Sequence, residues 1–201
     1  YRTLKVPGSL VKKIIITGAP LMLNEFLWAG GLTLQTQALS TKGLATVGGL
    51  NICNTIGNIS NCIFVTMGTT IAIVVGQLLG AGKLKEAKVT ATRMAAFSLL
   101  ISFGMIIILG LLGPVAAATP FISLSNSEYF ILRSGGKTII TFLFDSCFVC
   151  LVNVPVAICL TKFTAIHIVG IFFLVNMLEG VKALIGFIMV KKDIWLNTIV
   201  D

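Results

Sequence analysis

Five long apolar segments restrict what this chain can fold into. An α-helix rises 1.5 Å per residue and needs about 20 apolar residues to cross a hydrocarbon layer of roughly 30 Å. The segments that meet this requirement are residues 14–39, 46–79, 89–118, 138–160 and 165–190. Of the 201 residues, 56% are hydrophobic and 11% are charged, whereas a soluble domain carries about a quarter charged residues. We therefore predict an all-α integral membrane protein, a bundle of about five transmembrane helices in one domain over residues 1–201.

The positive charges bear on how the chain crosses the membrane. The chain has 15 Lys and Arg residues against 7 Asp and Glu residues. In a membrane protein this excess marks cytoplasmic loops rather than a nucleic-acid surface. Five crossings spread the basic residues over both sides, whereas one more crossing near residues 125–133 would leave only Lys42 and Lys162 outside. Because the stretch containing Asn126 and Glu128 is itself too short and polar to cross, we expect a helix to be deleted there.

The first segment carries an acid near its middle. A charge in a span costs about 2.5–3.5 kcal/mol even on the insertion scale, so it needs a functional or a structural reason. Glu25 follows Pro20, which frees a backbone carbonyl, and we predict a functional role for Glu25 because acids within a span often mark ion paths. The alternative is a hydrogen bond between helices. Asn24, Trp28 and Gln35 share one helical face and are predicted to line a substrate cavity.

Two later segments also contain acids. Asp145 shares a helical face with Thr138 and Thr141, and these oxygen atoms could bind a small cation or relay a proton. A structural role for Asp145 is equally open. Glu179 and Lys182 have the spacing of an ion pair within a helix, which favours a structural role for that pair.

The second segment carries a stripe of amides on one helical face. Such a stripe either forms hydrogen bonds between helices or lines a water-filled path for varied solutes, and both interpretations stay open. The four residues, predicted as part of the substrate cavity, are Asn51, Asn54, Asn58 and Asn61.

The motifs of soluble catalysis are weak or absent in the sequence. Cys147 and Cys150 have metal-ligand spacing but no second Cys or His pair nearby, so we interpret them as packing residues. The glycine-rich turn at residues 80–82 is not a P-loop, because Gln77 stands at the required first glycine and Leu84 at the hydroxyl position. We predict no enzyme, no bound metal and no cofactor.

Three sequence motifs together resemble one transporter family. They are Pro20-x3-Asn24-Glu25-x2-Trp28, Val75-Gly-Gln-Leu-Leu-Gly-Ala-Gly-Lys-Leu-Lys-Glu-Ala87 and Leu132-Arg-Ser-Gly-Gly-Lys-Thr138. Their order and spacing resemble the multidrug and toxic compound extrusion (MATE) transporters, which have twelve helices in two six-helix lobes. The resemblance is to the C-terminal lobe. Glu25 would be the coupling acid, one turn closer to the proline than in the better-known branch.

The resemblance implies a function and a set of partners. It implies secondary active efflux of organic cations or amphipathic drugs in exchange for Na⁺ or H⁺ by alternating access, with Glu25 and Asp145 as coupling residues. The partners would be the N-terminal lobe of the same transporter, a small-molecule drug and the lipid bilayer, with no nucleic acid. We expect a multi-pass protein of a prokaryotic plasma membrane. The alternatives are a flippase for lipid-linked saccharides from the same superfamily and a truncated membrane protein that transports nothing.

Overall fold

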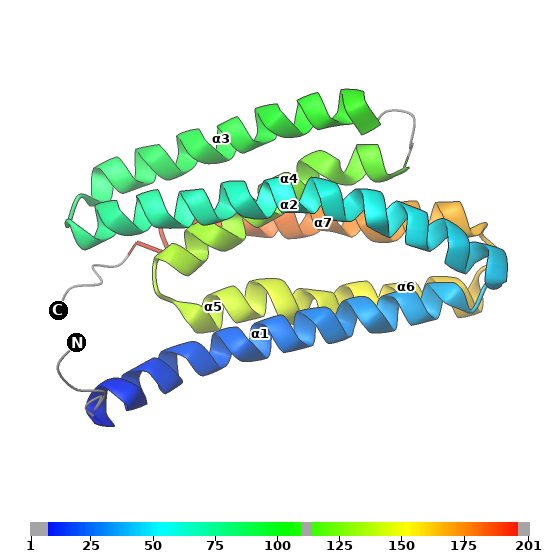
Figure 1. Cartoon of the computed structure of the whole chain (residues 1–201), viewed down its shortest axis with the longest axis horizontal. Coiled ribbons are helices and arrows are strands. Elements are labelled where there is room, and N and C mark those ends of the chain that lie inside the picture. The colour runs from blue at the N-terminus through cyan, green and yellow to red at the C-terminus, as the bar shows by residue number, and fades with distance from the viewer. Residues whose placement is uncertain (1–7, 110–113, 197–201) are drawn as a thin grey trace, which may run out of the picture.

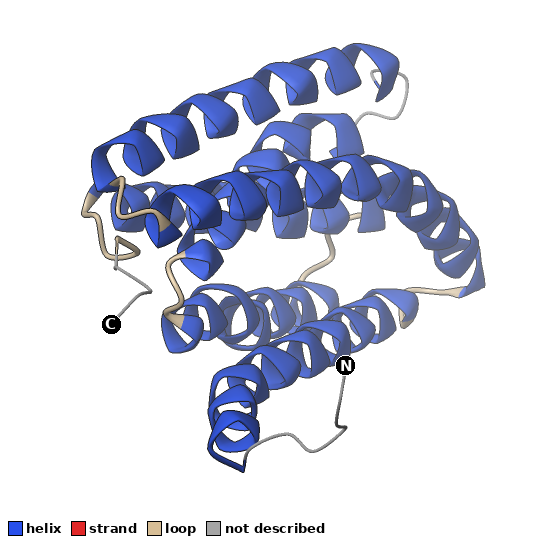
Figure 2. Cartoon of the chain, turned by 60° about the vertical axis from the view of Figure 1, so that its left-hand side comes forward, coloured by secondary structure: helices blue, strands red, loops and turns tan. Residues whose placement is uncertain are grey.

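The computed structural model describes residues 8–109 and 114–196, and the regular structure in these two ranges is helical (Figures 1 and 2). This confirms the predicted all-α bundle. The helices in chain order are α1 (Gly8–Ser40), α2 (Leu44–Gly80), α3 (Leu84–Leu109), α4 (Pro114–Ser134), a continuous rod made of α5 (Thr138–Phe142), η2 (Leu143–Cys147), η3 (Val149–Asn153) and α6 (Val154–Phe163), and α7 (Ile168–Lys191). We refer to the continuous rod, Thr138–Phe163, as the α5–α6 rod.

The bundle has a central helix, α4. It packs against α2, α3 and α7, while α1 lies along the α5–α6 rod (Figure 1). The α2 residues that turn inward recur every three or four positions, as an amphipathic helix requires; they are Phe64, Gly68, Ile71, Val75 and Leu79. The same core contains Tyr129, Phe130, Ile131 and Leu132 of α4.

The expected span 89–118 and the expected deletion near residues 125–133 are wrong. Helix α3 lies within Leu84–Leu109, and α4 begins at Pro114 and runs through residues 125–133 to Ser134. Proline suits the first turn of a helix because its missing N–H has no partner there in any case. The boundary between α3 and α4 was not visible in the sequence because the apolar run continues across it. The described residues form six long helical rods rather than the five expected.

The polar residues of α4 made it look unfit to cross a membrane, but they face other helices. The Ser98 and Ser123 hydroxyls of α3 and α4 lie 2.8 Å apart. The Ser125 hydroxyl donates to the Glu179 carbonyl of α7 over 3.3 Å. A helix enclosed by protein does not need the apolar surface that lipid demands, because its neighbours satisfy its polar groups.

In the part of the chain that the structure describes, four helices are long and apolar enough to span a membrane: Leu44–Gly80, Leu84–Ile107, Thr138–Phe163 and Ile168–Lys191. Figure 1 shows at its left-hand end the start of α1, the α2–α3 turn, the α4–α5 turn and the end of α7. By sequence these segments contain most of the described basic residues outside the core: Lys12, Lys83, Lys85, Lys88, Arg133, Lys137, Lys191 and Lys192. Lys162 lies in the last turn of α6, away from this end. Lys42, which donates to the Thr164 carbonyl over 3.1 Å, lies at the opposite end. This is the charge distribution expected of one additional crossing.

Candidate functional site

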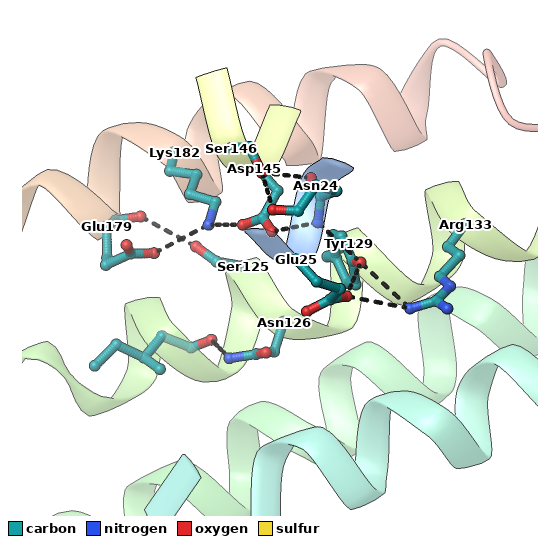
Figure 3. Close-up of polar contacts among 11 residues, drawn as sticks. Asn24, Glu25, Ser125, Asn126, Tyr129, Arg133, Asp145, Ser146, Glu179 and Lys182 are labelled. Carbon is teal, nitrogen blue, oxygen red and sulfur yellow. Dashed lines mark hydrogen bonds and ion pairs between the residues drawn. The ribbon is translucent and has the colours of Figure 1, made fainter. Parts of the chain in front are cut away.

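Polar side chains from four parts of the chain meet inside the bundle (Figure 3). We call this group the polar cluster. Its members are Asn24 and Glu25 of α1, Tyr129 and Arg133 of α4, Asp145 and Ser146 of η2, and Glu179 and Lys182 of α7.

Asn24 stands at the centre of the polar cluster and is fully buried. Its Nδ2 donates to Asp145 Oδ2 over 3.1 Å and to the Tyr129 hydroxyl over 3.3 Å. The Ser146 hydroxyl lies 2.7 Å from Asn24 Oδ1 and 2.6 Å from the Asn24 backbone carbonyl, and donates to them. One amide therefore connects α1 to both α4 and the α5–α6 rod.

The α5–α6 rod departs from α-helical geometry where it meets Asn24. Leu143–Cys147 and Val149–Asn153 are π-helical turns, and Pro155 follows in the first turn of α6. A proline removes one N–H from the helical ladder and crowds the carbonyl four residues earlier, which a wider turn accommodates. In the first of these turns the adjacent residues Asp145 and Ser146 are both buried, and both bond to Asn24.

Glu25 forms the exposed side of the polar cluster. The Tyr129 hydroxyl donates to Glu25 Oε1 over 3.2 Å, and Arg133 Nη1 lies 3.8 Å from the same oxygen. Arg133 Nη1 also donates to the Tyr129 hydroxyl over 3.3 Å. The Glu25 side chain is 61% exposed, so an ion or solute outside this chain can reach it.

Lys182 forms the buried side of the polar cluster. Its ammonium lies 2.7 Å from Asp145 Oδ1, 3.8 Å from Glu179 Oε2 and 5.5 Å from the centre of the Phe144 ring. The pair of Glu179 and Lys182 expected from their spacing is present, but the closer partner of Lys182 is Asp145. Through Tyr129 and Asn24, a continuous series of contacts joins exposed Glu25 to this buried ion pair (Figure 3).

Several residues predicted for the site lie outside the polar cluster. Trp28 and Gln35 are half-buried on the face of α1 that carries Asn24. The Thr141 hydroxyl donates to the Lys137 carbonyl over 3.2 Å rather than to Asp145. Of the amide stripe on α2, Asn61 is half-buried and the others, Asn51, Asn54 and Asn58, are exposed. Their role in a substrate cavity stays a prediction.

Sequence reasoning did not assign Tyr129 or Arg133 to the site. Both belong to α4, which the hydropathy pattern did not identify as a crossing. A signal was available, because Tyr129 and Arg133 are four residues apart and thus neighbours on one helical face. An aromatic hydroxyl and a guanidinium in that register would have pointed to a polar helix face within the bundle.

Comparison with known proteins finds similarity to membrane transporters. Residues 20–117 match the MatE family model. A solved structure with a similar fold is described as the outward-facing conformation of a multidrug resistance MATE family transporter of the MOP superfamily. The TM-score is 0.84 at 13% sequence identity, and the match covers 96% of this chain and 48% of the other. This chain therefore spans about half the length of that transporter. No match was found among curated proteins.

Proposed function

We propose that this chain forms one lobe of a secondary active multidrug efflux transporter. The lobe would exchange organic cations or amphipathic drugs for Na⁺ or H⁺ by alternating access, with an N-terminal lobe as its partner. The observation that carries the proposal is the polar cluster, in which exposed Glu25 is linked through Tyr129 and Asn24 to buried Asp145. The match of residues 20–117 to the MatE family model supports it.

The geometry supplies a way for an ion to change how the helices are held. When a cation or a proton neutralises Glu25, its attraction for Arg133 weakens, and so does the hydrogen bond from Tyr129. Since these contacts join α1 to α4, their loss alters the relative stability of the two arrangements of the lobe. Alternating access requires only that the ion and the drug prefer different arrangements.

The charge of the polar cluster favours cationic cargo over a pyrophosphate-linked saccharide. Glu25, Asp145 and Glu179 contribute carboxylates, against the cationic groups of Arg133 and Lys182. The most exposed of the five is Glu25, so an approaching solute meets an acid first. The other alternative, a truncated protein without transport, depended on a missing crossing, and α4 occupies that place.

Ethidium accumulation tests the proposed function. In cells that make this chain together with a cognate N-terminal lobe, we expect less ethidium to accumulate than in cells that make either part alone. Glu25→Gln should raise accumulation to the level of cells without the transporter, because the glutamine can neither lose a proton nor pair with a cation.

Glu86→Gln is the matched control for this experiment. Glu86 is an exposed acid in the first turn of α3 that pairs with exposed Lys83 over 3.1 Å, far along the chain from the polar cluster. Efflux should persist in this variant at an equal amount of protein in the membrane. If Glu25→Gln also leaves efflux unchanged, Glu25 has no part in coupling.

A further inference from the structure

Glu128 of α4 is a buried acid that the proposed mechanism has not used. The residue is 2% exposed, and neither Oε1 nor Oε2 has a hydrogen-bond partner among the described residues. An ionised carboxyl without a partner is among the most unfavourable groups to place in a low-dielectric interior. The Lys182 ammonium attracts the Glu128 carboxyl electrostatically, but its ion pairs are with Asp145 and Glu179, and Glu25 pairs with Arg133. In the arrangement seen here, Glu128 is therefore the acid that most needs a bound proton.

A glycine makes room for this carboxyl. A Cβ atom built on Gly186 of α7 would collide with Glu128 Oε2 and would lie 2.9 Å from Phe144 Cζ. Gly186 is four residues after Lys182, so the two share one face of α7. The Glu128 carboxyl and the Lys182 ammonium thus lie along the same face of α7, and both approach the ring of Phe144.

We propose that coupling uses H⁺, that Glu128 carries one coupling proton in addition to the proton that neutralises Glu25, and that Lys182 is a resident cation that makes the Glu128 site select H⁺ over a free metal cation. The inference rests on the proposed function as a transporter. With the proton on Glu128, Lys182 pairs with Asp145 and Glu179, as observed. When the O–H bond of Glu128 breaks, its electron pair stays on the carboxylate and the proton passes to water. The new carboxylate then competes with Asp145 for the Lys182 ammonium and changes the contact between α4 and α7.

The selectivity follows because oxygen atoms of the acids around Glu128 already have partners, which leaves few ligands besides the Glu128 carboxyl itself. Sodium would need several oxygen ligands, as hard cations do. Asp145 Oδ1 and Glu179 Oε2 face Lys182, and Asp145 Oδ2 accepts from Asn24. In the ranges that the structure describes, no group of three or more His, Cys, Asp or Glu residues is placed to hold a metal ion.

The surroundings of Glu128 contain few other charges that could supply this proton or compete for it. Helix α7 contributes Lys182 and Glu179, and η2 contributes Asp145. Helix α2 has no charged residue, and Arg133, on α4 itself, pairs with Glu25. The charged residues of α3 all lie in its first three turns, at the basic end of the bundle; they are Lys85, Glu86, Lys88 and Arg93.

Infrared spectroscopy of the whole chain in lipid tests the protonation without requiring transport. A protonated carboxyl has a C=O stretching band distinct from the bands of a carboxylate. We expect this band in the native chain at neutral pH, its loss in Glu128→Gln, and its persistence in Glu179→Gln, where a paired acid has been removed. Absence of the band from the native chain, or its persistence in Glu128→Gln, would overturn the assignment.

Ethidium export from membrane vesicles containing both lobes tests the coupling. We expect an imposed pH gradient to drive export and a Na⁺ gradient at fixed pH to drive none. In the native protein the pH gradient should increase export by roughly 5- to 150-fold, the range typical of coupled sites, and Glu128→Gln should abolish this increase. Gly186→Ala should also reduce export, because it displaces the Glu128 carboxyl. Gly180→Ala is its control on the same helix, since a Cβ there would lie 3.4 Å from Phe121, an ordinary contact.

The outcomes separate the two proposals. Export driven by the Na⁺ gradient alone, or native export by Glu128→Gln, would overturn the proton-selective site while leaving the transporter function intact. If neither the pH gradient nor the Na⁺ gradient drives export, the proposed function is overturned and, with it, the coupling role of Glu128. The infrared band would still decide whether Glu128 holds a proton.

Discussion

Asn24 shows how a single buried amide can fix the relative positions of three helices. It donates to Asp145 and Tyr129 and accepts from Ser146, so all of its polar atoms are in use. Its neighbour Glu25 is exposed and makes its contacts at the edge of the polar cluster. The two adjacent residues therefore have different roles: Asn24 links α1 to α4 and the α5–α6 rod, and Glu25 is accessible to an ion or solute.

Replacement of this amide should destabilise the protein. For Asn24→Ala we expect a loss of about 1–3 kcal/mol in the free energy of unfolding, because Asp145 and Ser146 lose partners while still buried. The measurement is thermal unfolding in detergent, followed by circular dichroism. Asn54→Ala is the control, since Asn54 is exposed on α2 and should unfold like the native chain. Equal melting of the two variants would contradict the central role of Asn24.

Lys182 and Asp145 should behave as an energetic unit. Lys182→Met leaves the buried Asp145 carboxylate without its cation, and we expect this to cost about 3–5 kcal/mol. Lys182→Met combined with Asp145→Asn should recover the part of that loss that comes from Asp145, because its unpaired charge is gone, while Glu179 still lacks its weaker contact with Lys182. A double-mutant cycle from unfolding curves measures the coupling, with Lys192→Met as the exposed control. Additive effects of the two substitutions would show that the 2.7 Å contact carries little energy.

At the scale of the elements, helices that face lipid were easier to predict from the sequence than α4, which is surrounded by other helices. Residues 46–79, 138–160 and 165–190 each lie within an observed helix or within a few residues of its ends. Hydropathy is informative there because those helices expose apolar side chains. Helix α4 was missed because its buried serines and Glu128 lower its hydropathy, although neighbouring helices provide hydrogen-bond partners for Ser123 and Ser125.

The same reasoning explains which parts of the site were predictable. Glu25 and Asp145 stood out because an acid in an apolar run is conspicuous. Their connection was not predictable, because Asn24 is 105 residues from Tyr129 and 121 residues from Asp145 along the chain, and meets them only through packing. The π-helical turns around Asp145 also shift the face that an α-helical register assigns to Thr141.

Substitution of two glycines of α2 tests how closely α2 packs against α4. A Cβ on Gly68 would collide with the Phe130 ring, whereas nothing lies within 4 Å of the corresponding position at Gly76. We expect Gly68→Ala to destabilise the chain by about 1–3 kcal/mol through overpacking. Gly76→Ala should have no such effect and should favour the helix by about 1 kcal/mol. Thermal melts of both variants decide this, and a stabilised Gly68→Ala would mean that α2 and α4 pack less closely.

At the scale of the whole molecule, most basic residues lie near helix ends at one end of the bundle. Lys88 at the start of α3 pairs with Asp193 just after α7 over 2.6 Å, and Arg133 lies near the end of α4 at the same end of the bundle. Because basic loops stay on the cytoplasmic side, this end is expected to face the cytoplasm. Six rods return the chain to that side, whereas five would not.

Cysteine labelling can establish this topology. After replacement of the 5 native cysteines, single cysteines at Lys85 and Gly136 should react with a membrane-impermeant maleimide from one side of the membrane. Cysteines at Thr41 and Ile166 should react from the other side. The physical reason is that α4, Pro114–Ser134, is expected to return the chain across the bilayer. Labelling of Gly136 and Lys85 from opposite sides would mean that α4 does not cross.

The burial of α4 has a consequence for biosynthesis. The ribosome delivers α4 after α2 and α3 but before α7, so part of its polar surface emerges without the helix that will cover it. Lipid is a poor solvent for Ser125 and Glu128 during that interval. We expect the nascent α4 segment to stay at the insertion machinery, away from lipid, until α7 has been made. Deletion of α7 should therefore lower the amount of the chain that accumulates in the membrane, whereas unchanged accumulation would show that α4 inserts without it.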